Sequence, residues 1–316
     1  MRNFADALVR KIAELDNPTV MGLDPKLDYI PQFLIDKAVA EYPGDAQKAT
    51  AHAIWLFNKA LIDAVCDIVP AIKPQFAYYE LYGIEALKVL DKTVKYAQSK
   101  GMLVIADCKR NDIGATSTAY AEGIIGSTEI IDGSKISMSG FDCATVNGYL
   151  GIDGVKPFLD VCSRDGKGIY ILVRTSNPSA GDLQDLELKD GRKVYEAMAE
   201  LVNTWGADLI GEEGFSSVGA VVGATWPEQA VEARKLMPHT LILVPGYGAQ
   251  GAGPDAAVAS FTKDGRGSIV NASRSLMCAW KKRDDLAPED FAKATKDEAI
   301  DMKTKLNNAL KDRKYV

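Results

Sequence analysis

The feature that most constrains the fold is a regular alternation of short apolar runs and longer amphipathic segments. The apolar runs are rich in Val and Ile, and each ends in polar residues, Gly or Pro, which is typical of strands buried in a parallel sheet. Eight runs fit this description, at 19–23, 68–73, 102–107, 143–147, 168–174, 218–223, 240–245 and 267–271.

Segments with a helical spacing of apolar residues separate these runs. An amphipathic helix is also predicted at the N-terminus, and the other predicted helices are at 50–66, 78–99, 116–125, 152–164, 193–205, 227–236, 254–261 and 290–311. Eight strands, each followed by a helix, predict an α/β fold in which residues 1–316 form one (β/α)8 barrel domain, a TIM barrel. A doubly wound sheet is the alternative, because periodicity alone does not separate the two.

Two longer connections interrupt the repeat, at 25–49 and 126–141. The first is rich in Pro and charge, and it is expected to be either a lid over a site or a surface excursion. We find no internal repeat and no linker composition, so both are interpreted as insertions within one domain.

Composition restricts the possible partners. The net charge of −6 and the pI near 5.2 disfavour a general affinity for nucleic acid or for an anionic membrane. The sequence has no apolar run of about 18 residues and no signal-peptide pattern, so a cytoplasmic location is expected. Five scattered cysteines and two histidines predict reduced thiols and no structural metal site.

Charged side chains follow the first three predicted strands, at the end where such a barrel builds its active site. Asp24 follows the first strand, Lys73 ends the second, and Asp107 and Lys109 end the third. On an extended chain Asp107 and Lys109 project to one face, while Cys108 points away. Each charge alone could be a solvated strand end. Four together, with balanced charges, favour a functional cluster.

The last two strands are followed by a second signal. The glycines of PGYGAQGAG, at 245–253, let backbone N–H groups approach an anion, and a helix predicted from Pro254 or Asp255 would point its positive end there. Arg274, after the eighth strand, supplies a guanidinium for phosphate. A glycine-rich loop alone is more often a flexible turn, but together with Arg274 it predicts a phosphate site, where barrels usually place one.

These motifs resemble those of the orotidine 5′-phosphate decarboxylase family, in its longer bacterial-type (type 2) subgroup. The segment 107–116 is similar to the family signature DxKxxDIGxT. Further matches keep the family order, at GLDP 22–25, KPQFAYYE 73–80, VNGYLG 146–151, RTSNPSAG 174–181, PGYGAQG 245–251 and NASRS 271–275. The resemblance spans nearly the whole chain, from Asp24 to about residue 280.

The resemblance implies a (β/α)8 barrel, a homodimer with active sites at the subunit interface, and no cofactor or metal. It implies conversion of orotidine 5′-phosphate to uridine 5′-phosphate and carbon dioxide in pyrimidine biosynthesis, with Lys109 stabilising a C6 carbanion and protonating it. Asp107 would lie against the substrate carboxylate. Asp112 and Thr116 would reach the partner subunit's site. Asp24 and Lys73 would hold ribose hydroxyls and the charge network, and Lys73 is counted with the catalytic residues. Ser176 would contact the pyrimidine, Gln250 would bridge the base and the phosphate, and Arg274 would bind the phosphate, with Pro245 as a further substrate contact.

Two other functions remain open. A metal-dependent phosphosugar decarboxylase or aldolase can share the barrel and a DxKxxD segment, although RTSNPSAG and the pairing of PGYGAQG with Arg274 favour a nucleotide. A non-catalytic nucleotide-binding barrel is the third possibility. It is disfavoured because Asp107, Lys109 and Asp112 are all present.

Overall fold

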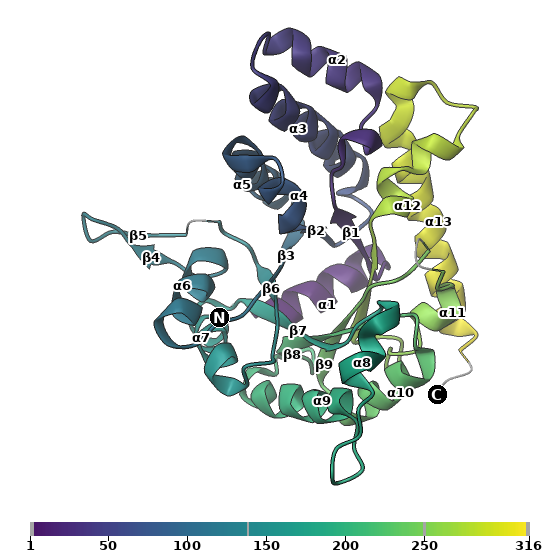
Figure 1. Cartoon of the computed structure of the whole chain (residues 1–316). Helices are drawn as coiled ribbons and strands as arrows, with labels where there is room; N and C mark the ends of the chain where they lie inside the picture. Colours follow the sequence, from purple (N-terminus) through teal and green to yellow (C-terminus); the bar gives the residue numbers. More distant parts are fainter. Residues whose placement is uncertain (1–2, 138, 249–250, 314–316) are drawn as a thin grey trace.

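A computed structural model describes residues 3–137, 139–248 and 251–313 of the chain. Eight parallel strands close into a barrel in the order β1-β10-β9-β8-β7-β6-β3-β2, and helices surround it (Figure 1). Because β1 pairs with both β2 and β10, the sheet closes on itself. The predicted (β/α)8 barrel is thus confirmed, and the doubly wound alternative is wrong.

All eight predicted strands are present, with their ends shifted by at most three residues. The barrel strands are β1 (Thr19–Leu23), β2 (Ala71–Pro74), β3 (Leu103–Arg110), β6 (Cys143–Val146), β7 (Gly168–Arg174), β8 (Ser216–Val222), β9 (Thr240–Val244) and β10 (Ser268–Ala272). The largest differences are at β2, which begins later than predicted, and at β3, which continues to Arg110.

The helices also follow the prediction, with three corrections. They are α1 (Phe4–Leu15), α2 (Gln32–Glu41), α3 (Ala46–Val65), α4 (Phe76–Glu80), α5 (Gly83–Ser99), α6 (Gly114–Ile124), α7 (Ile152–Asp165), α8 (Gly181–Gln184), α9 (Val194–Trp205), α10 (Pro227–Leu236), α11 (Pro254–Ala257), α12 (Arg274–Met277) and α13 (Phe291–Lys311). The segment predicted as one helix at 78–99 is broken before Gly83, whose φ of +76° lies outside the helical region. The helix predicted at 254–261 ends at Ala257. Three helices were not predicted: α2, in the connection 25–49, and the short helices α8 and α12.

Two apolar layers hold the barrel together. One fills its interior, where Leu103 and Ile105 of β3 meet Tyr170 of β7. Helix α1 packs Phe4 and Leu8 into the same cluster, so it closes the N-terminal end of the barrel. The other layer lies between the strands and the outer helices. The C-terminal ends of the strands are thereby left as the open end of the barrel.

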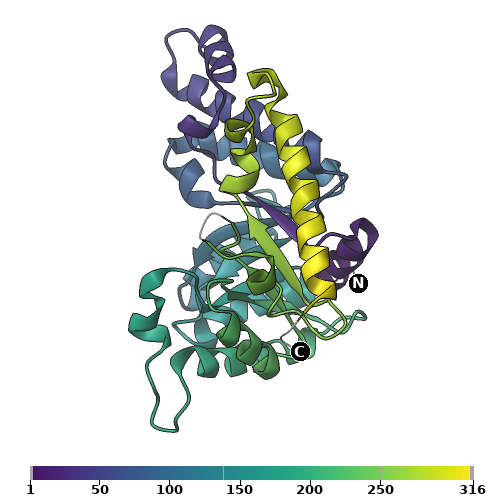
Figure 2. The same cartoon turned by 90° about the vertical axis from the view of Figure 1, so that its right-hand side faces the viewer.

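The insertion at 126–141 is a β-hairpin that projects from the barrel beside α6 (Figure 1). Its strands are β4 (Thr128–Glu129) and β5 (Lys135–Ile136), which pair antiparallel. A second connection, between α8 and α9, also extends away from the body, as the view in Figure 2 shows. Within the described residues, no helix is long and apolar enough to span a membrane.

Candidate active site

A pocket of about 740 Å³ opens at the C-terminal ends of the barrel strands. It brings together seven of the ten residues predicted for the site, namely Asp24, Lys73, Asp107, Lys109, Ser176, Pro245 and Arg274. Asp112 and Thr116 do not line it, and Gln250 lies outside the described residues. The sequence therefore located the pocket from residues that are far apart along the chain.

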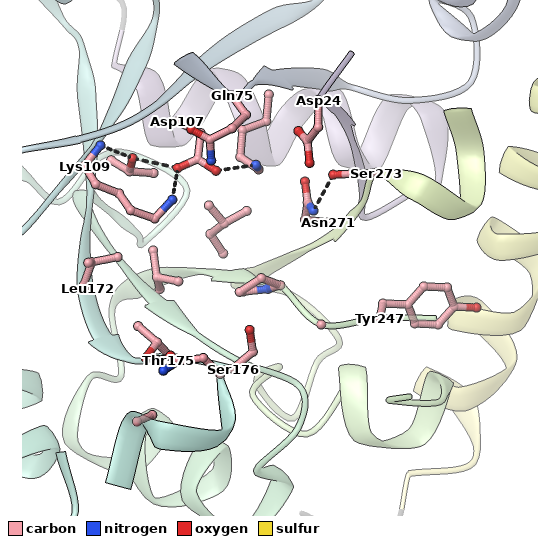
Figure 3. A pocket seen from close by; sticks show the side chains of 18 of the residues that line it. Asp24, Gln75, Asp107, Lys109, Leu172, Thr175, Ser176, Tyr247, Asn271 and Ser273 are labelled. Carbon is pink, nitrogen blue, oxygen red and sulfur yellow. Dashed lines mark hydrogen bonds and ion pairs between the residues drawn. The ribbon is translucent and has the colours of Figure 1, made fainter. Parts of the chain in front are cut away.

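Three charged side chains form a chain of ion pairs in this pocket. Asp107 lies between two lysines, with Oδ2 at 2.6 Å from Lys73 Nζ and Oδ1 at 2.5 Å from Lys109 Nζ. Lys73 and Asp107 are buried, whereas 45% of the Lys109 side chain is exposed to the pocket mouth. Figure 3 shows Lys109 and Asp107 in contact, with Asp24 farther along the same side of the pocket and Thr175 and Ser176 across from them. All three side chains line the pocket, and Lys109 is the most exposed of them.

The surroundings of Lys73 and Asp107 keep both side chains ionised. Burial opposes ionisation of Asp107, but the charges of Lys73 and Lys109 and their hydrogen bonds hold its pKa well below the usual value. Burial likewise opposes protonation of Lys73, but Asp107 and Asp24 raise its pKa. Burial raises the pKa of Asp24, and Lys73 partly offsets this. The pocket therefore holds fixed charges of both signs at neutral pH.

Asp24 contacts a polar corner that the sequence did not predict. Ser273 follows β10, accepts a hydrogen bond from Asn271 Nδ2 at 3.3 Å, and interacts with Asp24 (Figure 3). The Oδ1 atoms of Asp24 and Asn271 are buried without a hydrogen-bond partner among the described residues. Buried polar atoms of this kind need a partner, so this corner is suited to donors such as sugar hydroxyls.

The connection after β7 forms the opposite wall, which carries Ser176. Gly223 of the neighbouring connection permits this, because a Cβ atom there would lie 2.8 Å from Cα of Ser176. Gln184 binds Thr175 twice, accepting from its backbone N–H at 2.9 Å and donating to its hydroxyl at 2.8 Å. The buried Arg174 guanidinium in turn donates to Gln184 at 3.2 Å. Ser176 is therefore held by contacts behind the wall.

The glycines and the arginine that the sequence predicts for a phosphate site lie beside the pocket. Gly246 and Gly248 follow β9 with φ of 102° and 69°, a region that favours glycine. Arg274, the first residue of α12, lines the pocket and also an adjoining depression that contains Lys281, Lys282 and Lys305. Helix α11 has only four residues, so its dipole is weaker than the predicted longer helix would give. The positive charge at this end comes mainly from side chains.

Asp112 and Thr116 lie outside the pocket, Asp112 just before α6 and Thr116 in its first turn. Asp112 Oδ1 accepts from the backbone N–H of Ile113 at 2.8 Å, and Thr116 is exposed. Close packing on α7 holds the segment: a Cβ atom at Gly154 would lie 2.6 Å from Asn111 Oδ1. Neither Asp112 nor Thr116 lines the pocket that contains Lys109.

Sequence reasoning missed several lining residues. Besides Asn271 and Ser273, these include Gln75, Tyr78, Thr145, Leu172, Val221 and Leu243. Thr145 and Asn271 could have been found, since both are polar residues near the C-terminal end of a predicted strand. The apolar residues gave no signal, because a pocket floor and a barrel core have the same composition.

The fold and the pocket define a (β/α)8-barrel enzyme with its active site at the C-terminal ends of the strands. Residues 57–286 match the model of the orotidine 5′-phosphate decarboxylase / HUMPS family. The chain belongs to this family. The relatives described below are orotidine 5′-phosphate decarboxylases, which are carboxy-lyases.

The similarity extends over whole chains. The orotidine 5′-phosphate decarboxylase of Rhodopirellula baltica is 43% identical over 284 residues, which cover 90% of this chain and 91% of that protein. That of Clostridium perfringens (strain SM101) is 39% identical, with 97% and 99% covered. The structure of Leishmania donovani OMP decarboxylase superposes with a TM-score of 0.71 at 28% identity and covers 96% of this chain and 99% of that one.

Proposed function

We propose that this protein decarboxylates orotidine 5′-phosphate to uridine 5′-phosphate in pyrimidine biosynthesis, without a metal or cofactor. The observation that carries the proposal is the ion-paired chain of Lys73, Asp107 and Lys109 at the open end of the barrel. Family membership and the named relatives support the same substrate.

The reaction needs a fixed positive charge. Loss of the C6 carboxylate leaves an electron pair in the plane of the pyrimidine ring, where no neighbouring group can delocalise it. An ammonium held beside C6 stabilises this charge as it develops, and then transfers a proton to the carbon. Lys109 is suited to both steps, because its side chain is exposed to the pocket while Asp107 fixes its position.

Asp107 has a second proposed role. Its low pKa keeps it a carboxylate, so a substrate carboxylate placed beside it would be repelled. Departure of carbon dioxide relieves that repulsion, which disfavours the bound substrate more than the transition state. Lys73, which is buried beside Asp107, balances part of its charge and keeps it ionised.

The rest of the pocket is assigned to the nucleotide. Asp24, with Asn271 and Ser273 beside it, would bind ribose hydroxyls, since it offers an unpartnered buried oxygen. Ser176 would contact the pyrimidine. The phosphate would lie between Arg274 and the loop that follows Pro245, with Gln250 bridging base and phosphate.

The protein is proposed to act as a cytoplasmic homodimer in which Asp112 and Thr116 complete the partner subunit's site. Both residues lie outside their own pocket. Exposed apolar side chains occur on the same part of the fold: Ile113 follows Asp112, and Tyr149, Leu150 and Ile152 lie at the start of α7, which packs on α6. A large exposed apolar patch marks a contact surface, and a second copy of the chain would cover it while delivering Asp112.

The metal-dependent phosphosugar reaction is the competing proposal. Among residues 3–137, 139–248 and 251–313, no group of three or more His, Cys, Asp or Glu could hold a metal ion. Purified protein would be assayed with orotidine 5′-phosphate in the presence of a chelator, by the change in pyrimidine absorbance. Full activity supports the metal-free reaction, and loss that added metal restores would favour the alternative.

The decisive variant is Lys109→Ala. Turnover of orotidine 5′-phosphate is expected to fall by at least about 10⁴-fold, because both the charge stabilisation and the proton donor are removed. Binding of uridine 5′-phosphate, measured by calorimetry, should persist and show that the pocket is intact. Decarboxylation at the parental rate would reject Lys109 as the proton donor.

A further inference from the structure

The strand that carries the proposed catalytic pair is irregular where the pair lies. Ala106 of β3 pairs with Ala144 of β6, and Arg110 pairs with Val146, so residues 107–109 lie opposite the single residue 145. Lys109 has a φ of +45°, in the left-handed region that non-glycine residues rarely adopt. Bulges redirect side chains and recur beside active sites, where local strain is held by the surrounding structure.

Thr145, opposite the bulge, supplies the hydrogen bonds that the regular ladder would have made. The backbone N–H groups of Cys108 and Lys109 each donate to Thr145 Oγ1 at 3.0 Å. A hydroxyl has two lone pairs and one proton, so the proton remains free for an acceptor. Asp107 Oδ1 lies 3.1 Å away, closer than the carbonyl oxygen of Ala106 at 3.4 Å. One buried hydroxyl thus contacts all three bulge residues.

The two oxygens of Asp107 consequently have different partners. Oδ2 faces Lys73, while Oδ1 faces both Lys109 Nζ and Thr145 Oγ1. Through its contact with Oδ1, the Thr145 hydroxyl fixes the rotation of the Asp107 carboxylate. Through its hydrogen bond with the backbone N–H of Lys109, it also fixes the position of the Lys109 backbone. The contact between Lys109 and Asp107, visible in Figure 3, depends on both of these constraints.

We propose that Thr145 is a positioning residue for decarboxylation, whose hydroxyl sets the alignment of Asp107 and Lys109. The inference rests on the catalytic roles proposed above for those two residues. Removing the hydroxyl leaves two backbone donors without an acceptor in a buried place, which is costly. The bulge is then expected to relax toward regular pairing and to carry the ammonium away from its position.

The test compares three variants. Thr145→Val keeps the shape of the side chain and removes the hydroxyl, and Thr145→Ser keeps the hydroxyl and removes the methyl group. Thr19→Val is the matched control, because Thr19 is buried in β1 and its hydroxyl has no partner among the described residues. Values of kcat and KM for orotidine 5′-phosphate are measured together with the melting temperature.

Thr145→Val is expected to lower kcat roughly 10- to 100-fold, as misplaced catalytic groups do, with KM changed less than about threefold because binding contacts persist. Thr145→Ser should recover most of kcat, and Thr19→Val should match the parent. Hydrogen exchange of the peptide covering 103–110 should be faster in Thr145→Val alone. If Thr145→Val does not fold, Thr145→Cys replaces it, because cysteine is a weaker acceptor of similar size. The kcat of Thr145→Cys should lie between those of the parent and of Lys109→Ala.

Three results would overturn the proposal: parental kcat in folded Thr145→Val, equal losses in the Val and Ser variants, or unchanged exchange at 103–110. Its failure is distinguishable from that of the proposed function. If Lys109→Ala retains turnover, the assignment of the catalytic lysine is wrong. If Lys109→Ala is inactive and Thr145→Val is normal, only the role of Thr145 is wrong.

Discussion

At the scale of single residues, Gly22 shows how the absence of a side chain shapes the site. A Cβ atom there would lie 1.9 Å from Ser273 Oγ and 2.9 Å from Ser273 Cβ. Gly22→Ala is therefore expected to displace Ser273, to destabilise the protein by about 1–3 kcal/mol, as overpacking does, and to raise KM. Urea unfolding and steady-state kinetics measure the two effects.

A second glycine provides the control for this prediction. A Cβ atom at Gly123, in α6, would meet nothing within 4 Å. Gly123→Ala should stabilise the protein by about 0.5–1 kcal/mol through its higher helix propensity, without changing KM. Equal stabilities of the two alanine variants would show that the space at Gly22 is not a constraint.

Arg274 tests the phosphate end. Arg274→Ala should lower kcat/KM for orotidine 5′-phosphate about 100-fold, since it removes a charged hydrogen-bonding partner worth roughly 3 kcal/mol. With orotidine, which lacks the phosphate, the same substitution should have little effect. Lys282→Ala is the matched control, because Lys282 lies in the adjoining depression and does not line the pocket. An equal loss with both substrates would contradict the phosphate assignment.

At the scale of elements, the connection after β7 depends on one buried arginine. The Arg174 guanidinium donates to Asp185 at 3.1 Å and to Gln229, and it lies 4.7 Å from the centre of the Trp226 ring. Arg174→Met would leave these acceptors without a donor. Because Asp185 is partly exposed, we expect a loss of about 2–3 kcal/mol rather than the full cost of a broken buried pair.

The same substitution should loosen the wall that carries Ser176. KM should rise, and hydrogen exchange at 175–185 should accelerate, while the barrel strands keep their protection. Arg192→Met is the control. Arg192, on the connection between α8 and α9, pairs with Asp190 and with Glu200 of α9, but 42% of its side chain is exposed, so its loss should cost less than about 1 kcal/mol. Similar effects of the two substitutions would argue against a role for burial.

The bulge in β3 also marks a limit of prediction from sequence. The residue pattern was enough to predict the strand and where it ends. The expectation that Asp107 and Lys109 face the same side agrees with their contact in the pocket. The positive φ of Lys109 and the contacts of Thr145 depend on the register between β3 and β6, which pairs residues far apart along the chain. Arg174 is a similar case, because the register between β7 and β8 shifts beside it.

At the scale of the whole molecule, the barrel itself was predictable because eight strand-and-helix units leave few ways to close a sheet. The charged cluster was predictable because a barrel gathers the ends of its strands at one mouth. The placement of Asp112 was of a different kind. No local pattern distinguishes a residue that serves its own pocket from one that serves a neighbour's, and the proposal for Asp112 rests on the family resemblance and on its position outside the pocket.

That proposal predicts complementation between inactive subunits. In a hybrid of Lys109→Ala and Asp112→Ala subunits, one site receives both lesions, and the other has an intact lysine from one chain and an intact aspartate from the other. Random mixing makes half of the dimers hybrid, so activity should recover to about one quarter of the parental value for a twofold-symmetric dimer. Native mass spectrometry of subunits with different tags verifies the exchange.

The control mixture separates action in trans from any general effect of mixing. Lys73 and Lys109 line the same pocket of one barrel. Lys73→Ala and Lys109→Ala subunits therefore leave a lesion in every site of every dimer, and their mixture should remain inactive. Recovery in this control would mean that the barrels share more than Asp112 and Thr116. If exchange is complete and the Lys109→Ala and Asp112→Ala mixture also stays inactive, Asp112 acts within its own subunit, and the segment 111–117 must move toward its own pocket when substrate binds.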